Sequence, residues 1–521
     1  MSVDRVWYDV CGLDDILPDT GVCAAVADRQ IAIFRIGGKV YAIDNRDPAS
    51  GTNVLSRGIV GDMGGELVVA SPLFKQHYSL QTGRCLEEAA YSVRVYPCRS
   101  VFGRVRISDA IRDRPTVVRR RRLVVVGNGM AGMRVVEELL QLAPELYDIE
   151  VFGAEPHGNY NRILLSPVLA GEKQIDDIML HPLSWYEKQG VKLHCGDPVV
   201  SIDRRRRCVK SARGIESGYA RLLIATGSNP IILPIPGHEL PGVVTFRDIC
   251  DVTTMLEASR RHSHAVVVGG GLLGLEAANG LRCQGMDVTV VHLAADLMER
   301  QLDRIAARLL QTSLEQRGIR FRLETQTAAI LGESRANQVY FSDGSRLSAD
   351  LVVMAVGVRP NTTLAQAAGL RCERGILVDD TMQTFDPSVY AVGECVQHRN
   401  TTYGLVAPLW EQARVCAAHL AESGLTRYRG TMAATHLKVT GINVFSAGNL
   451  ADSEQSESLV FQDIKCGVYK RLVVENDRVR GAVLYGDTAD GSWYAELMAE
   501  GRRVGPLRHQ ILFGEKACST P

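Results

Sequence analysis

The chain has 521 residues and a formal net charge of zero, from 59 basic and 59 acidic side chains. Hydrophobic residues make up 46% and charged residues 23% of it, which is typical of a globular protein of several domains and excludes disorder or a disulfide-stapled mini-protein. The balanced charge argues against nucleic acid or an anionic membrane as a partner. The apolar runs are too short for a membrane helix and the first residues form no apolar signal segment, so we expect a cytoplasmic protein.

The 13 cysteines are scattered and form no C-x-x-C or C-x-C pair. An odd number of cysteines in a cytoplasmic protein favours free thiols, most of them buried. The scattering gives no support for a zinc ribbon or a locally encoded iron–sulfur site. We therefore predict no metal ligands.

Apolar or alternating segments in residues 1–108 predict an all-β domain of short strands. These segments are Val22–Val26, Gln30–Ile36, Val40–Ile43, Glu66–Ala70, Ser92–Tyr96 and Gly103–Ile107. Gly37 and Gly38 alone separate the second segment from the third, which predicts a tight hairpin. Residues 109–122 are basic and contain a proline, which indicates an exposed linker; a basic docking strip is the alternative.

From Leu123 on, strand-like runs alternate with helical ones. This alternation predicts βαβ units and parallel sheets. After about residue 431 the pattern returns to mixed strands, which are expected at Val439–Ala447, Tyr469–Glu475 and Val479–Gly486. The chain should therefore contain an all-β domain, a large α/β region and a small α+β domain, in that order.

The sequence G-N-G-M-A-G at residues 127–132 follows a strand-like run and opens a helical one. In such a turn the first glycine allows the tight bend, the second lets a pyrophosphate approach the backbone, and the third permits close packing of helix on strand. The helix N-terminus adds free N–H donors. The residues assigned to this dinucleotide site are Gly127, Gly129, Met130, Ala131 and Gly132. Glu155, near the end of the next strand, is placed to accept a hydrogen bond from a ribose hydroxyl.

A second copy of this turn, G-G-G-L-L-G, occupies residues 269–274. The residues assigned to it are Gly269, Gly271, Leu272, Leu273 and Gly274. A single match could be a glycine-rich turn without a ligand. Two copies, each between a strand and a helix, instead imply two dinucleotide sites in one chain.

The order of these turns and of three later segments resembles the pyridine-nucleotide-disulfide and ferredoxin-reductase superfamily of flavoproteins. The later segments are Arg221–Pro230, Ala355–Asn361 and Val389–Cys395. The resemblance implies FAD on the first turn and NAD(P)H on the second, in two Rossmann-like domains of the glutathione-reductase type. The further cofactor contacts that it implies are at Ala225, Thr226, Gly227, Gly357, Gly393 and Glu394. The family usually has Asp where this chain has Glu394.

Three more residues are assigned through the resemblance. Trp410 would lie where a helix begins beneath the flavin and where the helix N-terminus stabilises negative charge on the reduced ring; a plain core residue is the alternative. Glu276 matches a glutamate close to the nicotinamide and is the one catalytic candidate; an ordinary exposed helix residue is the alternative. His292 ends the strand after the second turn, where an acidic residue would favour NAD and an arginine NADP. The choice of nucleotide therefore stays open, with NADH favoured.

At two places the sequence differs from the superfamily pattern near the flavin, and these differences limit the reactions expected of the chain. Residues 159–167 lack the cysteine that the disulfide-reducing branch uses, so thiol-relay chemistry is not expected. Pro167 follows Ser166 at a place where ferredoxin reductases often have a lysine near the flavin. Asn161 and Arg162 are kept as candidates for the flavin neighbourhood.

Longer strings resemble one branch of the superfamily more specifically. Residues 128–132, 151–156, 159–172, 291–294 and 297–303 are similar to the flavin half of NADH-dependent nitrite reductase large subunits and of assimilatory nitrate reductase electron-transfer subunits. This resemblance covers about residues 121–450.

Residues 1–108 resemble the Rieske-type small subunit of the same nitrite reductase system. A Rieske centre needs two cysteines and two histidines, and the matching positions hold Asn45, Asp47, Ser71 and Phe74. We therefore expect a Rieske-like domain without an iron–sulfur cluster, with a docking or structural role.

The resemblance thus divides the chain into six parts. These are a Rieske-like domain (1–108), a basic linker (109–122), the two parts of an FAD domain (123–240 and 361–430), an NAD(P)H domain between them (241–360), and a C-terminal interface or dimerisation domain (431–521). The chain lacks the cysteine-rich and sirohaem segments of nitrite reductase, so it is expected to oxidise NAD(P)H and to pass electrons through FAD to a separate nitrate reductase or sirohaem nitrite reductase. The alternatives are an NADH reductase of a ferredoxin or rubredoxin, and a flavin-binding scaffold or sensor with little turnover. A homodimer is one option for the assembly.

Overall fold

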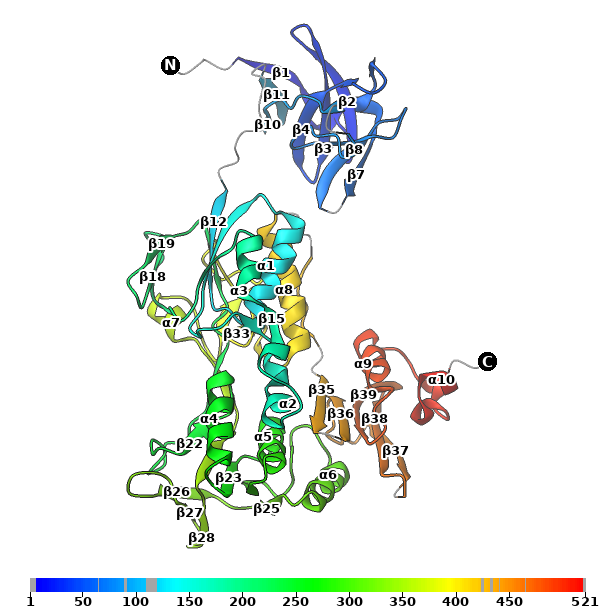
Figure 1. The fold of residues 1–521 in the computed structure, drawn as a ribbon. Helices are drawn as coiled ribbons and strands as arrows, with labels where there is room; N and C mark the ends of the chain where they lie inside the picture. The colour runs from blue at the N-terminus through cyan, green and yellow to red at the C-terminus, as the bar shows by residue number, and fades with distance from the viewer. Residues whose placement is uncertain are drawn as a thin grey trace. The chain divides into compact units, whose positions relative to one another are not determined.

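The computed structural model describes residues 6–63, 65–88, 91–108, 120–422, 426–431, 434–439, 441–463 and 465–518. They form two compact units, one made mainly of the residues before Arg121 and the other of the residues that follow (Figure 1). The predicted basic linker lies outside the described residues from 109 to 119. None of the helices in the described part of the chain has the length and apolar character that crossing a bilayer requires.

The first unit is built of short antiparallel strands, which confirms the predicted all-β class. Three three-stranded sheets have the orders β2-β3-β4, β7-β8-β9 and β1-β11-β10, and β5 pairs with β6. The strands are β1 (Trp7–Gly12), β2 (Thr20–Val26), β3 (Arg29–Ile36), β4 (Lys39–Asp44), β5 (Arg46–Asp47), β6 (Thr52–Asn53), β7 (Ile59–Met63), β8 (Glu66–Ala70), β9 (His77–Ser79), β10 (Cys98–Val101) and β11 (Arg104–Ser108). The hairpin at Gly37 and Gly38 is confirmed. Both glycines have positive φ, 54° and 79°, as a two-residue type I′ turn requires.

The predicted strand Ser92–Tyr96 is wrong. Its backbone bonds are divided between two partners: the Val93 amide donates to Gly83 and the Tyr96 amide donates to Ala42. Only an isolated bridge from Val95 to Ile43 results. An apolar alternation gives a half-buried extended segment here, but no continuous ladder.

The second unit contains two five-stranded parallel sheets, as the βαβ pattern predicted (Figure 1). The first has the order β16-β13-β12-β20-β32, with strands Lys192–His194, Tyr147–Phe152, Arg121–Val126, Arg221–Ile224 and Val389–Ala391. The second has the order β22-β29-β23-β24-β25, with strands Val243–Thr245, Leu351–Met354, His264–Val268, Asp287–Val291 and Arg320–Arg322. In each sheet a glycine turn follows the strand (β12 or β23) at which the order of connections reverses, the usual place for a ligand in such a fold.

Helices join and cover these strands. They are α1 (Met130–Leu142), α2 (Leu165–Leu169), α3 (Leu183–Lys188), α4 (Ile249–Ser259), α5 (Leu272–Cys283), α6 (Arg304–Gln316), α7 (Thr363–Ala367) and α8 (Val406–Leu420). Small antiparallel additions are β14 (Asn159–Tyr160) with β15 (Met179–His181), β17 (Val199–Asp203) with β18 (Cys208–Ser211) and β19 (Glu216–Gly218), β21 (Ser228–Pro230) with β30 (Val358–Pro360), and β26 (Thr327–Leu331) with β27 (Gln338–Phe341) and β28 (Arg346–Ser348). A mixed sheet joins β31 (Ile376–Val378), β33 (Val396–His398) and β34 (Thr401–Thr402).

The C-terminal part is one antiparallel sheet of order β35-β36-β39-β38-β37 with the helix α9 (Gly491–Glu500) and the short α10 (Glu515–Cys518). Its strands are β35 (Ala434–Val439), β36 (Ile442–Gly448), β37 (Ser456–Asp463), β38 (Val468–Glu475) and β39 (Arg478–Tyr485). The predicted strand Val439–Ala447 is wrong as a single element, because it spans the turn between β35 and β36. Gly441, with φ of +76°, makes that turn.

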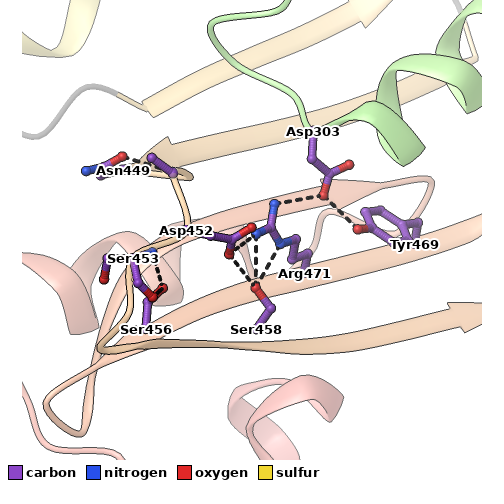
Figure 2. A network of polar contacts seen from close by, with 9 residues as sticks. Asp303, Asn449, Asp452, Ser453, Ser456, Ser458, Tyr469 and Arg471 are labelled. Atoms are coloured by element: carbon purple, nitrogen blue, oxygen red, sulfur yellow. Dashed lines mark hydrogen bonds and ion pairs between the residues drawn. The ribbon is translucent and has the colours of Figure 1, made fainter.

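The C-terminal sheet packs on α5 and α6 of the second parallel-sheet region. Tyr469 and Val483 belong to the same buried apolar cluster as Leu281 and Leu314. At its edge, the Asp303 carboxylate accepts hydrogen bonds from the Ala306 amide (2.9 Å), the Tyr469 hydroxyl (2.7 Å) and Arg471 (3.5 Å) (Figure 2). One carboxylate thus caps α6 and fixes the C-terminal sheet on that helix.

The thirteen cysteines are free, as predicted, but only three are buried: Cys85, Cys395 and Cys416. The expectation that most are buried is therefore wrong. Cys250 and Cys283 illustrate the reason, since they lie on exposed faces of α4 and α5, where a small side chain needs no packing partner.

Replacement of Tyr469 by Phe should weaken the attachment of the C-terminal sheet. Tyr469 is fully buried and its hydroxyl donates to a carboxylate, so we expect the free energy of unfolding of this part to fall by about 1–3 kcal/mol. Urea unfolding of the full chain measures the change. The control is Tyr340→Phe on β27, for whose hydroxyl the structure shows no partner among the described residues. A Tyr469→Phe midpoint equal to that of the control would contradict the role of this network.

Candidate functional site

The first glycine turn connects β12 to α1. Gly127 has φ of +112°, and its amide donates to the carbonyl of Phe152 (2.8 Å). A Cβ on Gly127 would lie 2.2 Å from the carbonyl oxygen of Ala225. The backbone of Ala225, one of the predicted site residues, therefore leaves room for no residue but glycine at position 127.

The second glycine turn repeats this geometry between β23 and α5. Gly269 has φ of +122°, and its amide donates to Val291 (2.8 Å). A Cβ on Gly269 would lie 2.3 Å from the carbonyl oxygen of Ala355. The sequence duplication is thus a duplication of structure.

The middle glycine of each turn faces open space. A Cβ on Gly129 or Gly271 would meet no protein atom within 4 Å, whereas one on Gly132 would lie 2.9 Å from the Ala225 Cβ and one on Gly274 would lie 2.0 Å from a carbonyl oxygen. Each turn is therefore closed where helix packs on strand and open where a pyrophosphate would approach. The residues fit a dinucleotide at both turns.

The first helical residues of each turn lie beside these openings. Met130 and Ala131 begin α1, and Leu272 and Leu273 begin α5. The helical hydrogen bonds start with the carbonyls of Gly129 and Gly271, which accept from residues 133 and 275 (both 3.0 Å). The preceding amides have no partner within their helix, and such amides can hold an anion.

Glu155 follows β13, as predicted, and its carboxylate is paired. It accepts a hydrogen bond from the Tyr160 hydroxyl (2.7 Å) and forms an ion pair with Arg162. Its side chain remains 30% exposed, and a carboxylate has acceptor sites beyond these two. Asn161 instead uses its side-chain oxygen to cap the 3-10 helix Arg162–Leu164 by accepting from the Ile163 amide (3.1 Å).

Glu394 is held by two partners that are far away in the sequence. It accepts from the Ser228 hydroxyl (2.7 Å) and pairs with Arg247, and both charged side chains are at least four-fifths buried. The neighbouring Gly393, with φ of +93°, lies close enough to α1 that a Cβ would be 3.1 Å from that of Ala131. The predicted second flavin segment and the first glycine turn therefore come together.

Sequence analysis missed Arg247, which links the two carboxylates. It follows β22, carries no motif, pairs with Glu394 and accepts a hydrogen bond from Arg162 at its carbonyl (3.0 Å). Arg162 in turn pairs with Glu155. A continuous polar chain thus runs along the region predicted for the flavin.

Asn128, inside the first turn, was also missed, although its place in the motif was a signal. Its side chain accepts from the Tyr186 hydroxyl (2.7 Å).

The chain crosses between the two parallel-sheet regions at Thr226, Gly227 and Gly357. The Thr226 hydroxyl donates to the carbonyl of Asn361 (2.8 Å), the Asn361 amide donates to Gly227 (2.9 Å), and β21 pairs with β30. Gly227 and Gly357 both have positive φ, 67° and 119°. The A-T-G and G-V-R-P segments therefore form one double crossover.

Glu276 lies at the junction of the two parallel-sheet regions. It accepts a hydrogen bond from the Ser166 hydroxyl on α2 (2.6 Å). Burial raises the pKa of its carboxyl to about 7, against the opposing effect of the Ser166 hydrogen bond. Glu276 is not an ordinary exposed helix residue, because its side chain is partly buried and contacts α2. The group is poised between its protonated and ionised forms at neutral pH.

Trp410, on α8, is half-buried. The guanidinium of Arg134 on α1 lies 5.6 Å from the centre of its ring. Next to it, the fully buried Gln412 accepts a hydrogen bond from the Gly393 amide (3.0 Å). The start of α8 is therefore adjacent to α1 and to the Gly393 segment.

Of the four positions that correspond to Rieske ligands, Asp47 and Ser71 are hydrogen-bonded to each other in the interior. Asp47 is fully buried and accepts from the hydroxyls of Ser71 and Tyr78, both at 2.6 Å. Burial by itself would raise the pKa of Asp47, but these hydrogen bonds outweigh it and lower the pKa below its usual value. Asn45 accepts from the Ser56 amide (2.8 Å), and Phe74 is largely exposed. Neither the residue types nor the geometry fit a cluster that needs two thiolates and two imidazoles.

Three protein-family models match the chain. "Pyridine nucleotide-disulphide oxidoreductase" matches residues 121–419, "Rieske-like [2Fe-2S] domain" matches 6–108, and "Rubredoxin NAD+ reductase C-terminal domain" matches 434–502. A ferredoxin reductase from Rhodopseudomonas palustris is structurally similar, with a TM-score of 0.70 and 27% identity over 77% of this chain and all of that one. These matches confirm the predicted fold class.

Curated relatives support the closer resemblance. A nitrite reductase [NAD(P)H] of Bacillus subtilis is 50% identical over 72% of this chain and 46% of its own length. An assimilatory nitrate reductase electron transfer subunit of the same species is 46% identical over 76% of this chain and 51% of its own length. The chain thus spans about half the length of these relatives. From the two open glycine turns and the family match over more than half of its residues, the chain belongs to the pyridine nucleotide-disulphide oxidoreductase family.

Proposed function

We propose that this chain is an NAD(P)H-dependent FAD reductase that passes electrons to a separate assimilatory nitrate or nitrite reductase. Membership of the family implies FAD and NAD(P)H as ligands. The observation that carries the proposal is the pair of equivalent turns with open glycines, Gly129 and Gly271. The relatives in nitrate and nitrite reduction supply the class of acceptor.

In this proposal the chain's residues bind and orient, while the cofactors supply the redox chemistry. The bound nicotinamide would give up a hydride and the flavin would accept it. The turn at Gly129 would hold the FAD pyrophosphate, and Glu155 and Glu394 would bind other polar groups of the same nucleotide. The turn at Gly271 holds the nicotinamide dinucleotide. Glu276, which accepts a hydrogen bond from Ser166, would offer a carboxylate to positive charge that develops on a bound nicotinamide.

The parts outside the two parallel sheets have supporting roles in the proposal. Residues 1–108 form a docking or structural domain without an iron–sulfur cluster, since Asp47 and Ser71 bind each other where ligands would stand. The segment 431–521 serves as an interface or dimerisation domain. The protein is cytoplasmic in this proposal, and a homodimer is one option for its assembly. In the same proposal, residues 123–240 and 361–430 form the FAD domain and residues 241–360 form the NAD(P)H domain.

Anaerobic mixing of the flavin-loaded protein with NADH tests the central claim. Loss of the flavin absorbance within one turnover, followed by reduction of a nitrate or nitrite reductase catalytic subunit, is expected. An absorbance that does not change would identify a binding scaffold or sensor and overturn the proposal. Reduction of a rubredoxin or ferredoxin alone would favour the second candidate, which rests on the match of residues 434–502 to a rubredoxin reductase domain.

Two alanine substitutions in the first turn should have different effects. Gly127→Ala places a Cβ against the Ala225 carbonyl at positive φ, so it should destabilise the fold by more than about 1 kcal/mol. Gly129→Ala meets no protein atom, so it should fold normally and lose bound flavin. Thermal unfolding and the ratio of flavin to protein absorbance measure both effects. Full flavin content in Gly129→Ala would contradict the assignment of this turn to FAD.

The rate of flavin reduction by NADH should depend on the ionisation of Glu276. The pKa of Glu276 is raised to about 7, so its carboxyl group is mostly protonated and neutral below that pH and mostly an anionic carboxylate above it. Because the anion stabilises positive charge on the nicotinamide, we expect the rate to rise severalfold as the pH increases through about 7.

Glu276→Gln keeps the Ser166 hydrogen bond and removes the charge, so it should abolish this step in the profile. Glu315→Gln, on the exposed face of α6, is the matched control and should retain the step. Stopped-flow reduction from pH 6 to 8 compares the three proteins. A step that survives in Glu276→Gln would assign the titration to another group.

Protein purified from iron-supplemented cells should contain no stoichiometric iron. The reason is the ligand set, in which carboxylate, amide, hydroxyl and phenyl groups replace the thiolates and imidazoles. Metal analysis measures the content of the full chain. About two irons per chain, as one binuclear cluster requires, would contradict the prediction.

A further inference from the structure

The second glycine turn has an unusual neighbour at the end of β24. His292 stands where an acidic residue would recognise the ribose of NAD, and its side chain is only 11% exposed. The Gly270 amide donates to its Nδ1 (3.1 Å), so this nitrogen is unprotonated and the neutral ring carries its proton on Nε2. Nε2 lies 3.1 Å from the carboxylate of Glu299. His292 thus connects the glycine turn to a carboxylate seven positions later.

The segment that carries Glu299 lies against the same turn. The Met298 amide donates to the carbonyl of Gly270 (3.1 Å). The buried Leu297 approaches so closely that a Cβ on Gly270 would be 2.8 Å from its side chain. The side chain of Glu299 nevertheless remains 44% exposed, so its carboxylate can accept further hydrogen bonds.

The other end of this segment is anchored by the C-terminal sheet. Asp303 caps α6 and accepts hydrogen bonds from Tyr469 and Arg471 (Figure 2). Arg471 also donates to Asp452 (2.6 Å). Because residues 297–303 are held at both ends, the Glu299 carboxylate is presented on a fixed backbone beside the nucleotide turn.

We propose that Glu299, oriented by His292, binds the adenosine ribose of the nicotinamide dinucleotide through its 2′-hydroxyl and disfavours a 2′-phosphate. The inference rests on the proposed function and deepens it by selecting NADH. The carboxyl end of β24 is where that ribose lies in a dinucleotide fold. A carboxylate there accepts from the hydroxyl and repels a phosphate. Among the described residues, no hydrogen bond or ion pair joins His292 to the neighbouring Asp296 or Arg300.

Binding of ADP-ribose and of 2′-phospho-ADP-ribose, measured by calorimetry on the full chain, tests this inference without any electron transfer. The wild type should prefer ADP-ribose. In Glu299→Gln the Kd for ADP-ribose should rise about tenfold, as expected for a lost hydrogen bond to a charged group, and the Kd for the phosphorylated probe should fall. Asp296→Asn is the matched control and should keep the wild-type ratio.

An unchanged ratio in Glu299→Gln, an equal shift in Asp296→Asn, or no preference in the wild type would overturn the inference. Its kinetic counterpart is a higher KM for NADH in Glu299→Gln with unchanged kcat for flavin reduction, because the ribose contact is far from the hydride. A protein that prefers ADP-ribose through Glu299 but is not reduced by NADH would instead refute the proposed reductase function and leave the nucleotide assignment intact.

Discussion

The close approach of a carbonyl to a glycine is the constraint on which both parallel-sheet regions depend. In the first region the Ala225 carbonyl leaves no room for a side chain at Gly127, and in the second Ala355 does the same at Gly269. The chain can therefore turn from strand to helix within a few residues only because glycine adopts a positive φ there. This turn leaves the helix amides and the middle glycine exposed at the carboxyl edge of the sheet. The same steric constraint therefore shapes the glycine turn of each parallel-sheet region.

Long-range polar contacts also join the two parallel-sheet regions. Arg247 joins Glu394 to the Arg162–Glu155 pair, and Glu276 reaches from α5 to Ser166 on α2. These charges are mostly buried, so each needs its partner to offset the cost of leaving water. The same requirement fixes the relative positions of the elements that carry them. The Glu276 carboxyl shows the effect most clearly, since burial without an ion pair raises its pKa to about 7.

The C-terminal sheet and the N-terminal unit illustrate two uses of a buried carboxylate. Asp303 receives Tyr469 and Arg471 and thereby connects the C-terminal sheet to the segment beside the nucleotide turn. Asp47 on β5 accepts hydrogen bonds from Ser71, just after β8, and from Tyr78 on β9, and so connects these three segments. In both cases a single acceptor joins separate elements of the fold, because an ionised carboxylate accepts from several donors at once.

The amino-acid sequence by itself determined the fold class and both dinucleotide turns, since these depend on local periodicity and on glycines at fixed spacing. It also singled out Glu155 by its place after a glycine turn, and Glu276 and Glu394 through the family resemblance, as candidates whose roles remain predictions. Local signals failed where bonding was shared between partners, as at Ser92–Tyr96, and where one glycine divided an apolar run, as at Gly441. Only the tertiary structure revealed the partners of these carboxylates and the link from His292 to Glu299. Such contacts join residues that are far apart in the chain, or that lie in an irregular loop, and neither arrangement leaves a periodic trace in the sequence.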